Sequence, residues 1–254
     1  MPLFTDGPIS ELDDLSAHDS QLLTVAASEG IDVTRKLALA QDEIRLELST
    51  LFSNRSSLDQ SFWAPSQLSL NSVAVTPALK FWHIYRALAL VYGDLYSSQL
   101  NDRYGAKRDQ FRQKAQWAYN KLLESGVGVV PDPIPQAATP AVTAITGNLP
   151  DGTYYITMAW LNSGGEEGAC AVPAVITLSS NGIQVQPQAV PQNAAQWNVY
   201  VGDAPETMVL QNGAPVYFGQ IWEQTAFLAG AGKKPGSGQE PSYYKPLPRV
   251  MQRG

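Results

Sequence analysis

The chain has 254 residues, which is enough for one large domain or two modest ones. Its hydrophobic content of 44% is normal for a globular protein, and its net charge of −6 argues against a general nucleic-acid binder. One cysteine and two histidines exclude an internal disulfide and disfavour a zinc site. No window of about 18 apolar residues occurs, so we expect no membrane span, and the N-terminal sequence lacks the basic and apolar parts of a secretory signal.

Charge is distributed unevenly along the sequence. Residues 1–50 carry ten acidic and three basic side chains, whereas residues 80–124 carry eight basic and four acidic ones. No Lys or Arg lies between Lys121 and Lys233, and the remaining five basic residues lie from Lys233 onward. This segregation predicts different faces for different partners, although charges that merely cluster on solvated faces would give the same pattern.

The first 16 residues contain Pro, Gly and several acidic side chains with little periodicity, which predicts an extended N-terminal arm over 1–16. A short helix then begins at a cap formed by Ser16 or Asp19. Gly30 is expected to end it, because glycine is favoured just past a helix C-terminus.

A longer helix follows over 33–52, with Asp32 as its N-cap. Its apolar residues recur at helical steps and form one stripe: Val33, Leu37, Ala40, Ile44, Leu48, Leu51 and Phe52. Residues 53–76 are rich in Ser and Asn and predict a long loop, of a length that is usually functional or mobile. The alternative is that Phe62 and Trp63 simply plug the helical core.

Two long helices are predicted over 77–125, packed as an antiparallel hairpin. Thr76 and Pro77 form a favourable start, and Gly126 stands where a helix usually ends. The apolar residues that we expect to face the core are Phe81, Ile84, Leu88, Val91 and Leu95 in the first helix and Tyr104, Phe111, Ala115, Ala118 and Leu122 in the second.

Four prolines predict a semi-rigid linker over 131–140, which would follow a helical domain over 17–130. From 141 to 230 the hydrophobic period becomes two, with a turn signal about every ten residues. This pattern predicts an antiparallel β-sandwich of the immunoglobulin or fibronectin type III style. The expected core anchors, which could alternatively be surface aromatics that stack on sugars, are Trp160, Trp197 and Trp222.

The last segment, 231–254, mixes Gly and Pro with aromatic, aliphatic and basic side chains. We expect an extended C-terminal arm that orders on a partner protein, and the alternative is a floppy terminus. The fold class is therefore α + β multidomain: an N-terminal α-helical bundle, an antiparallel β-sandwich and an extended arm.

No catalytic signature accompanies these elements. His18 and His83 are expected to be capping or packing residues, and the adjacent carboxylates Glu166 and Glu167 should point apart. The sequence lacks a nucleophile elbow, a zinc-protease motif and a phosphate-binding loop. We therefore expect no enzyme activity, no metal and no cofactor.

Two helical stretches resemble head-to-tail adaptor (connector) proteins of tailed bacteriophages and prophages. The run HDSQLLTVAASEGIDVTRKLALAQDEIRLEL is similar to the start of such adaptors, and FWHIYRALALVYGDLYSSQLNDRYGAKRDQFRQKAQWAYNKLLESGVGVV is similar to their closing helices. This resemblance covers about residues 17–130. PDGTYYITMAWLNSGGEEG and WNVYVGDAPETM resemble the fibronectin-type modules of phage virion proteins, although minimal adaptors lack such a module.

The resemblance implies a structural virion protein of the neck, assembled in the bacterial host cytoplasm. Adaptors form rings, commonly of twelve copies, beneath the portal protein. The ring extends the DNA channel and carries the next neck, stopper or tail protein. DNA would pass through it without sequence-specific binding, and no membrane is involved.

Site residues follow from the same resemblance and the charge layout. An acidic channel wall would repel DNA phosphates, so we expect Asp42, Glu43 and Glu47 to line the channel. The basic residues Arg108, Arg112 and Lys114 would contact acidic faces of a neighbouring copy. The arm that inserts into the portal would use Tyr243, Tyr244, Lys245, Leu247, Arg249, Val250 and Arg253.

Two other classes of function stay open. A tail, baseplate or capsid-decoration protein would bind protein or glycan through the sandwich and would expose a row of aromatic side chains there. A non-viral multidomain binding protein would be a stable monomer.

Overall fold

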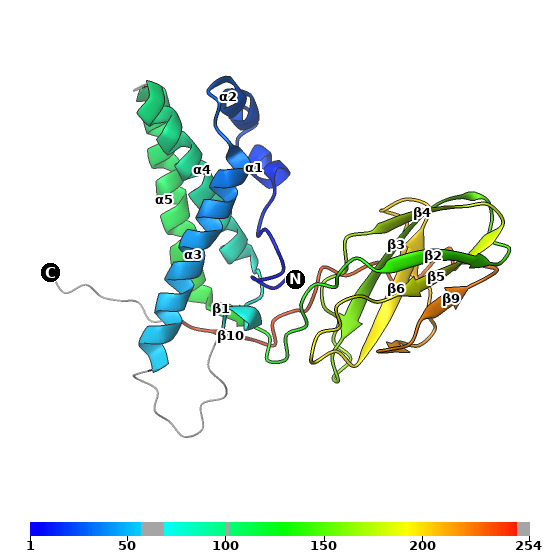
Figure 1. Ribbon diagram of the computed structural model, residues 1–254. Helices are drawn as coiled ribbons and strands as arrows, with labels where there is room; N and C mark the ends of the chain where they lie inside the picture. Colours follow the sequence, from blue (N-terminus) through cyan, green and yellow to red (C-terminus); the bar gives the residue numbers. More distant parts are fainter. Residues whose placement is uncertain (57–68, 100–101, 248–254) are drawn as a thin grey trace. The chain divides into compact units, whose positions relative to one another are not determined.

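The computed structural model describes residues 1–56, 69–99 and 102–247. Helices fill the N-terminal half and antiparallel sheets the C-terminal half, so the chain has an α+β fold (Figure 1). The predicted Phe62 and Trp63 lie outside the described residues.

The chain forms two compact units. The helical unit comprises Gly7–Val129 and the segment that begins at Pro241, and the β unit comprises Met1–Asp6 and Val130–Glu240. The chain therefore passes between the two units three times. Each unit is built from segments distant in sequence, which the predicted linear order of domains did not include.

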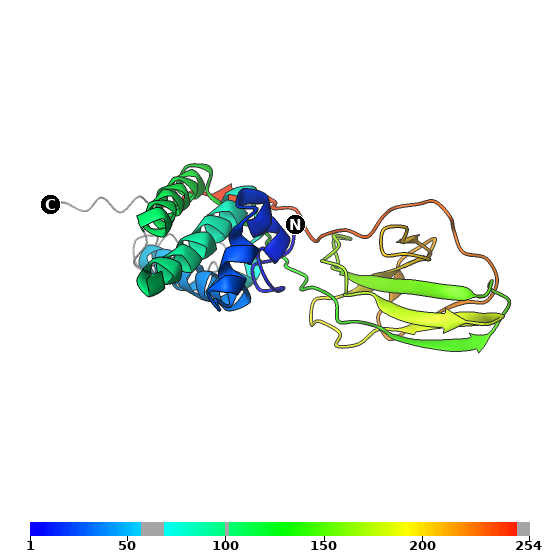
Figure 2. The ribbon, with the colours of Figure 1, turned by 90° about the horizontal axis from the view of Figure 1, so that it is seen from above.

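In the helical unit, α4 lies between α3 and α5 (Figures 1 and 2). The three predicted long helices are confirmed, and the third α-helix continues four residues beyond its predicted end. The helices of the described residues are α1 (Leu12–His18), α2 (Leu22–Ser28), α3 (Val33–Ser56), α4 (Pro77–Gln99) and α5 (Asp102–Ser125), with a 3₁₀ turn at Leu70–Ser72.

Local capping chemistry sets two of the helix ends. The Oδ1 atom of Asp32 accepts a hydrogen bond of 3.0 Å from the backbone N–H of Arg35, which satisfies a free donor at the start of α3. Gly126 follows α5 with φ of +86°, a left-handed conformation that glycine adopts without steric cost. Both roles were predicted from the sequence.

Four residues of the apolar stripe predicted for α4 are buried as expected, namely Ile84, Leu88, Val91 and Leu95, but the central position of α4 buries its other sides as well. Its buried residues point in all directions around the helix, as expected for a helix covered on several sides. Phe81, predicted to face the core, is 38% exposed, whereas its neighbours Trp82 and His83 are buried. The stripe predicted for α3 from Val33 to Leu51 is buried as expected.

A short antiparallel ribbon closes the helical unit. Strand β1 (Val127–Val129) pairs with β10 (Tyr243–Lys245), and Val129 also forms a bridge to Val73 on its other side. Leu247, just after β10, is buried. The arm predicted over 231–254 was expected to order on a partner protein, but residues 243–247 are ordered on this chain itself, because backbone pairing with β1 and burial of Leu247 hold them on the helical unit.

Two further segments predicted as extended arm or linker belong to folded units. Helix α1 begins within the predicted arm 1–16, and Phe4 at the start of that arm is fully buried. Ile134, within the predicted linker 131–140, is also fully buried and joins the core of the β unit. The prolines keep this segment extended, and Ile134 and Ala137 from it both pack into that core.

The β unit consists of two antiparallel sheets that share one hydrophobic core. One sheet has the strand order β2-β5-β9 and the other β4-β3-β6-β7, with β8 paired to the start of β6. Trp160 and Trp197 face each other as strand partners and are fully buried, and Trp222 is buried too, which confirms all three as core anchors. The strands are β2 (Ala141–Thr146), β3 (Gly152–Leu161), β4 (Ala174–Leu178), β5 (Asn181–Gln186), β6 (Gln196–Gly202), β7 (Val209–Leu210), β8 (Val216–Tyr217) and β9 (Trp222–Gln224).

Candidate interaction surfaces

The three acidic residues predicted to line a channel lie on two sides of α3. Glu43 forms an ion pair with Arg86 of α4, with 2.5 Å between Glu43 Oε2 and Arg86 Nε. Glu47 lines a groove next to α4. Asp42 is 63% exposed and pairs with Arg45 on its own helix. Because successive residues of a helix are rotated by about 100°, Glu43 and Glu47 face α4 and α5 while Asp42 points outward.

The groove runs over α4 between α3 and α5 and has a volume of about 270 Å³. The rings of Trp82 and Tyr119 lie in it with centroids 4.9 Å apart. It thus combines an aromatic surface with two guanidinium groups and one carboxylate. The lining residues are Glu47, Trp82, Arg86, Ala89, Arg112, Ala115, Gln116 and Tyr119.

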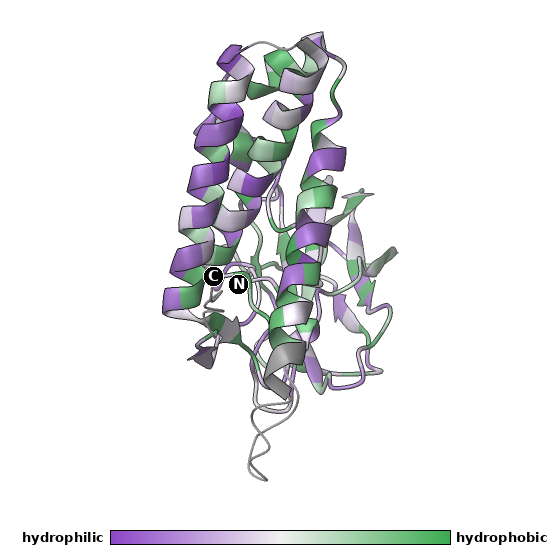
Figure 3. Ribbon diagram, turned by 90° about the vertical axis from the view of Figure 1, so that its left-hand side faces the viewer, coloured by the Kyte–Doolittle hydropathy of each residue, from purple (hydrophilic) through white to green (hydrophobic). Residues whose placement is uncertain are grey.

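The basic residues predicted to contact a neighbouring copy already have partners within the chain. The guanidinium of Arg108 binds Asp109 at 2.8 Å, and the Nζ atom of Lys114 lies 5.6 Å from the ring centroid of Tyr85. Arg112 is the most exposed of the three, at 62%, and its nitrogen lies 3.8 Å from Asp109. Hydrophilic residues nevertheless follow the length of α5, the left-hand helix of Figure 3.

Large apolar side chains are exposed on the outer faces of α3 and α5. Leu39 and Leu46 of α3 are 41% and 71% exposed, and Trp117 of α5 is 51% exposed. The sequence analysis missed these three residues. The available signal was their position off the buried stripe of an otherwise amphipathic helix.

The predicted portal-binding residues differ in burial, and some of them lie outside the described residues. Tyr243 and Tyr244 are exposed on β10, Lys245 is partly exposed, and Leu247 is buried. The other three, Arg249, Val250 and Arg253, lie outside the described residues.

A polar network joins α4 and α5 to the segment between α1 and α2. The carboxylate of Asp19 accepts hydrogen bonds from Lys107 Nζ at 2.5 Å and from the Tyr92 hydroxyl at 2.6 Å. Burial alone would raise the pKa of Asp19, but these two hydrogen bonds and the lysine charge lower it below the usual value. The network therefore holds the segment between α1 and α2 against α4 and α5.

His83 is buried and hydrogen-bonded at both ring nitrogens. Its Nε2 donates to the carbonyl oxygen of Leu37 at 3.0 Å, so Nδ1 accepts from the Ser10 hydroxyl at 2.7 Å. Burial lowers the pKa of His83, which keeps the ring neutral at pH 7. The ring fastens the segment before α1 to α3 and α4, as the packing interpretation predicted.

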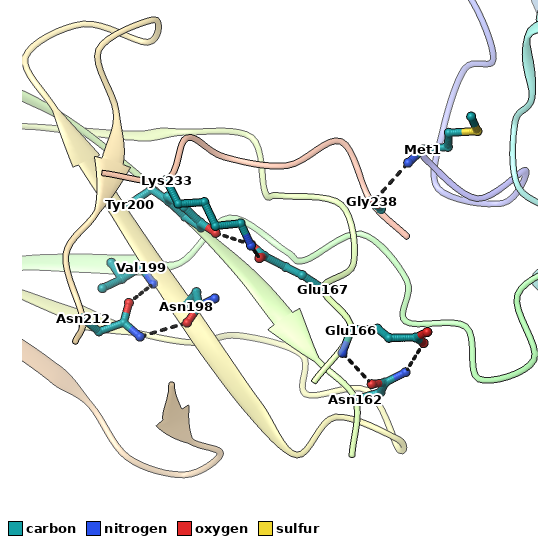
Figure 4. Close-up of polar contacts among 10 residues, drawn as sticks. All are labelled: Met1, Asn162, Glu166, Glu167, Asn198, Val199, Tyr200, Asn212, Lys233 and Gly238. Atoms are coloured by element: carbon teal, nitrogen blue, oxygen red, sulfur yellow. Dashed lines mark hydrogen bonds and ion pairs between the residues drawn. The ribbon is translucent and has the colours of Figure 1, made fainter. Parts of the chain in front are cut away.

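In the β unit, Glu166 and Glu167 point to different partners, as expected for adjacent residues (Figure 4). Glu166 accepts from the Asn162 side chain at 2.8 Å, whereas Glu167 binds the Tyr200 hydroxyl and Lys233. Burial and the bond to Glu167 raise the pKa of Tyr200, so its hydroxyl stays protonated as a donor. The two carboxylates therefore do not converge on one substrate.

Other polar groups of the β unit also form hydrogen bonds within that unit (Figure 4). Asn212 accepts from the N–H of Val199 at 2.9 Å and donates to Asn198 at 2.9 Å. The amine of Met1 donates to the carbonyl oxygen of Gly238 at 2.9 Å. These contacts hold loops and strands of the β unit together.

Several large apolar residues of the β unit are exposed close together in sequence. They surround β8 and β9, and Phe227 is the most exposed at 87%. We call this set the aromatic edge; its members are Tyr217, Phe218, Ile221 and Phe227.

Within residues 1–56, 69–99 and 102–247, no group of three or more His, Cys, Asp or Glu is placed to hold a metal ion. None of the helices described there is long and apolar enough to cross a membrane. Comparison with known proteins found no matching family model, no similar curated protein and no similar solved structure.

Proposed function

We propose that this chain is a structural protein of a phage virion, a head-to-tail adaptor. Copies would form a ring under the portal protein, extend the DNA channel and carry the next neck or tail protein. The observation that carries the proposal is the helical unit, in which the short helix α2 is followed by the three long helices α3, α4 and α5, in the order that the adaptor-like segments imply. The function requires no chemistry, only geometry and surfaces.

Exposed apolar residues on the outer faces support assembly. Large apolar side chains that are exposed near one another commonly mark protein contacts, whereas single ones are normal on a soluble protein. Leu39 and Leu46 are exposed two turns apart on one side of α3, and Trp117 is a large exposed side chain on α5. They are the reason for proposing a partner on each flank of the helical unit.

The proposal assigns acidic residues of α3 to the wall of the DNA channel. Of the three candidate residues, Glu47 carries a charge that faces a groove, whereas the charge of Glu43 is compensated by Arg86. Arg86 and Arg112 also line that groove, so the two carboxylates and the two guanidinium groups balance and the wall would be about neutral at this level. A neutral wall still avoids tight phosphate binding, because attraction needs a net positive surface.

The β unit is proposed to be an immunoglobulin-like or fibronectin-like module. Its sheet order β4-β3-β6-β7 matches strands C′, C, F and G of that architecture, and the pair β2-β5 matches B and E. The fully buried Trp160 on β3 corresponds to the tryptophan that such domains carry on strand C. One difference is β9, which lies beside β5 but follows the G-like strand in sequence.

The proposal is tested by electron microscopy and light scattering of the purified chain, alone and mixed with a portal ring. We expect closed rings with a central passage that dock coaxially on the portal. A chain that is monomeric in both conditions, or that binds the portal without forming a ring, contradicts the proposal.

The aromatic edge favours a second candidate function. A tail or capsid-decoration protein that binds protein or glycan through the β unit would expose aromatic residues there, as Tyr217, Phe218 and Phe227 are exposed. Binding of the full chain to a glycan array, lost on changing Phe227 to Ala, would support this candidate. Rings that form without any glycan or protein binding by the β unit would remove it.

A further inference from the structure

We infer that the helical unit binds a second copy of itself through two different faces: the outer face of α3 in one copy and the outer face of α5 in the next. The inference rests on the proposed function and names the contact that would close the ring. Its evidence is the position of three exposed apolar residues relative to the helical core.

The outer face of α3 is apolar where a solvated helix would be polar. Leu39 and Leu46 are seven residues apart, so they share one side of the helix. That side is opposite to Ala40, Ile44 and the other residues that face the core. With Leu46 71% exposed, these leucines remain uncovered by the described part of the chain.

The outer face of α5 offers a complementary feature. Trp117 is 51% exposed and points away from Ala115 and Ala118, which are buried against the unit. Tryptophan is the residue type most often found at the energetic centre of protein interfaces. Lys114 and Lys121 lie one turn before and after it on the same side of the helix.

The two faces lie at the same level along the helical unit. Glu47 of α3 and Gln116 of α5 line the same groove across α4, and each is adjacent in sequence to one of the exposed apolar residues. Leu46 and Trp117 therefore lie on the two flanks of the unit at about the same height. Copies placed side by side with parallel helices bring Leu46 of one against Trp117 of the next.

Charge agrees with this pairing. Asp42 lies one turn before Leu46, and Lys114 lies one turn before Trp117. Since α3 and α5 run in the same direction (Figure 1), parallel copies place Asp42, which is 63% exposed and pairs with Arg45, at the level of Lys114. The ammonium of Lys114 would leave the ring of Tyr85 to bind this carboxylate. The contact joins unlike faces, so it repeats from copy to copy and closes into a ring when the rotation between copies allows it.

The inference changes one predicted role. Asp42, which the charge pattern assigned to the channel wall, would lie in the contact between copies. Glu47, which lines the groove, would remain available to a channel, whereas Glu43 stays paired with Arg86. Arg112, on the groove side of α5, would then face the same space as Glu47 instead of a neighbouring copy.

Single charged substitutions on each face test the contact. We expect Leu46→Glu and Trp117→Glu each to reduce the assembled chain to monomers in light scattering, with unchanged helical circular dichroism. The control is Leu23→Glu on α2, where the leucine is 41% exposed but lies on neither face. This control should assemble like the unmodified chain.

Mixing the two variants tests that the faces are different. The Leu46→Glu chain keeps its α5 face and the Trp117→Glu chain keeps its α3 face, so a mixture should give dimers with one intact contact. If both variants assemble like the unmodified chain, or if their mixture stays monomeric, the inference is overturned while the adaptor proposal survives through other contacts. An unmodified chain that stays monomeric at millimolar concentration and on a portal overturns both.

Discussion

Val129 on β1 and Tyr243 on β10 are direct partners in an antiparallel pair, although nearly the whole β unit lies between them in the sequence. The N–H of Ser242 donates to the carbonyl oxygen of Val129 at 3.0 Å, and on the other side of β1 the N–H of Ala74 donates to Gly128 at 3.0 Å. The β unit is thus inserted between two paired strands of the helical unit. Strand β10 and the buried Leu247 therefore contribute to the stability of that unit.

The burial of Leu247 gives the first prediction. Leu247 is 6% exposed, so Leu247→Ala leaves a cavity and should lower the free energy of unfolding of the helical unit by about 2–4 kcal/mol. Tyr244→Ala removes a side chain that is 49% exposed and should cost less than about 1 kcal/mol. Urea unfolding followed by helical circular dichroism measures both. Equal small losses would mean that this segment is not held on the helical unit.

Gly126 and Gly93 form a matched pair for the second prediction. A Cβ atom at Gly126 would lie 2.7 Å from the carbonyl oxygen of Lys245, and its φ of +86° disfavours other residues, so Gly126→Ala should cost about 1–3 kcal/mol. At Gly93 within α4 no heavy atom lies within 4 Å of an added Cβ, so Gly93→Ala should stabilise by up to about 1 kcal/mol. Thermal unfolding of the two variants should therefore shift in opposite directions. Shifts of the same sign would contradict the assigned backbone roles.

The carboxylate of Asp19 provides the third prediction. Its side chain is 7% exposed and binds Lys107 and Tyr92, so Asp19→Asn should lower the free energy of unfolding at pH 7 by about 1–3 kcal/mol. Because its folded pKa is lowered, this contribution is complete above its usual pKa of 3.8 and is lost as pH falls through the folded value. Asp13→Asn, at an exposed position of α1, serves as the control. A difference between Asp19→Asn and the unmodified chain that stays constant down to the most acidic pH tested would disprove the assignment.

Local signals predicted the parts of this fold that depend on a few neighbouring residues. The cap at Asp32, the helix end at Gly126 and the buried tryptophan at 160 each follow from residue type and spacing. The pairing of β1 with β10 could not be predicted from the sequence, because three-residue strands carry no periodicity and their partners are far apart in sequence. The buried position of Ile134 was missed because a proline-rich segment gives the same sequence pattern whether it is free or packed.

The candidate surfaces likewise combine features that the sequence predicted with features that only the structure shows. Charge counts along the chain indicated an acidic and a basic region, but not that Glu43 would be compensated by Arg86, since that contact joins two helices. Leu46 and Trp117 were visible in the sequence as apolar residues, but only the burial of their neighbours shows that they point outward. The assignment of faces therefore required the packing of three helices.

His83 provides the last prediction, a dependence of stability on pH. Burial lowers its folded pKa below the usual 6.5, so the folded chain binds fewer protons than the unfolded chain as pH falls. The contribution of His83 is complete above about pH 6.5 and decreases below it, by at most about 1.4 kcal/mol per pH unit. Burial and the charge of Lys114 also lower the pKa of His18, which adds to the same trend.

The two histidines can be separated by substitution, since the chain has no others. Urea unfolding of His83→Gln and His18→Asn between about pH 5 and 7 should give a smaller slope of unfolding free energy against pH in each variant than in the unmodified chain. The double variant should lose the histidine dependence altogether. Because Ser10 and Leu37 would keep at best one hydrogen bond, His83→Gln should also be less stable at pH 7. An unchanged slope in His83→Gln would show that this ring is not held neutral by its burial.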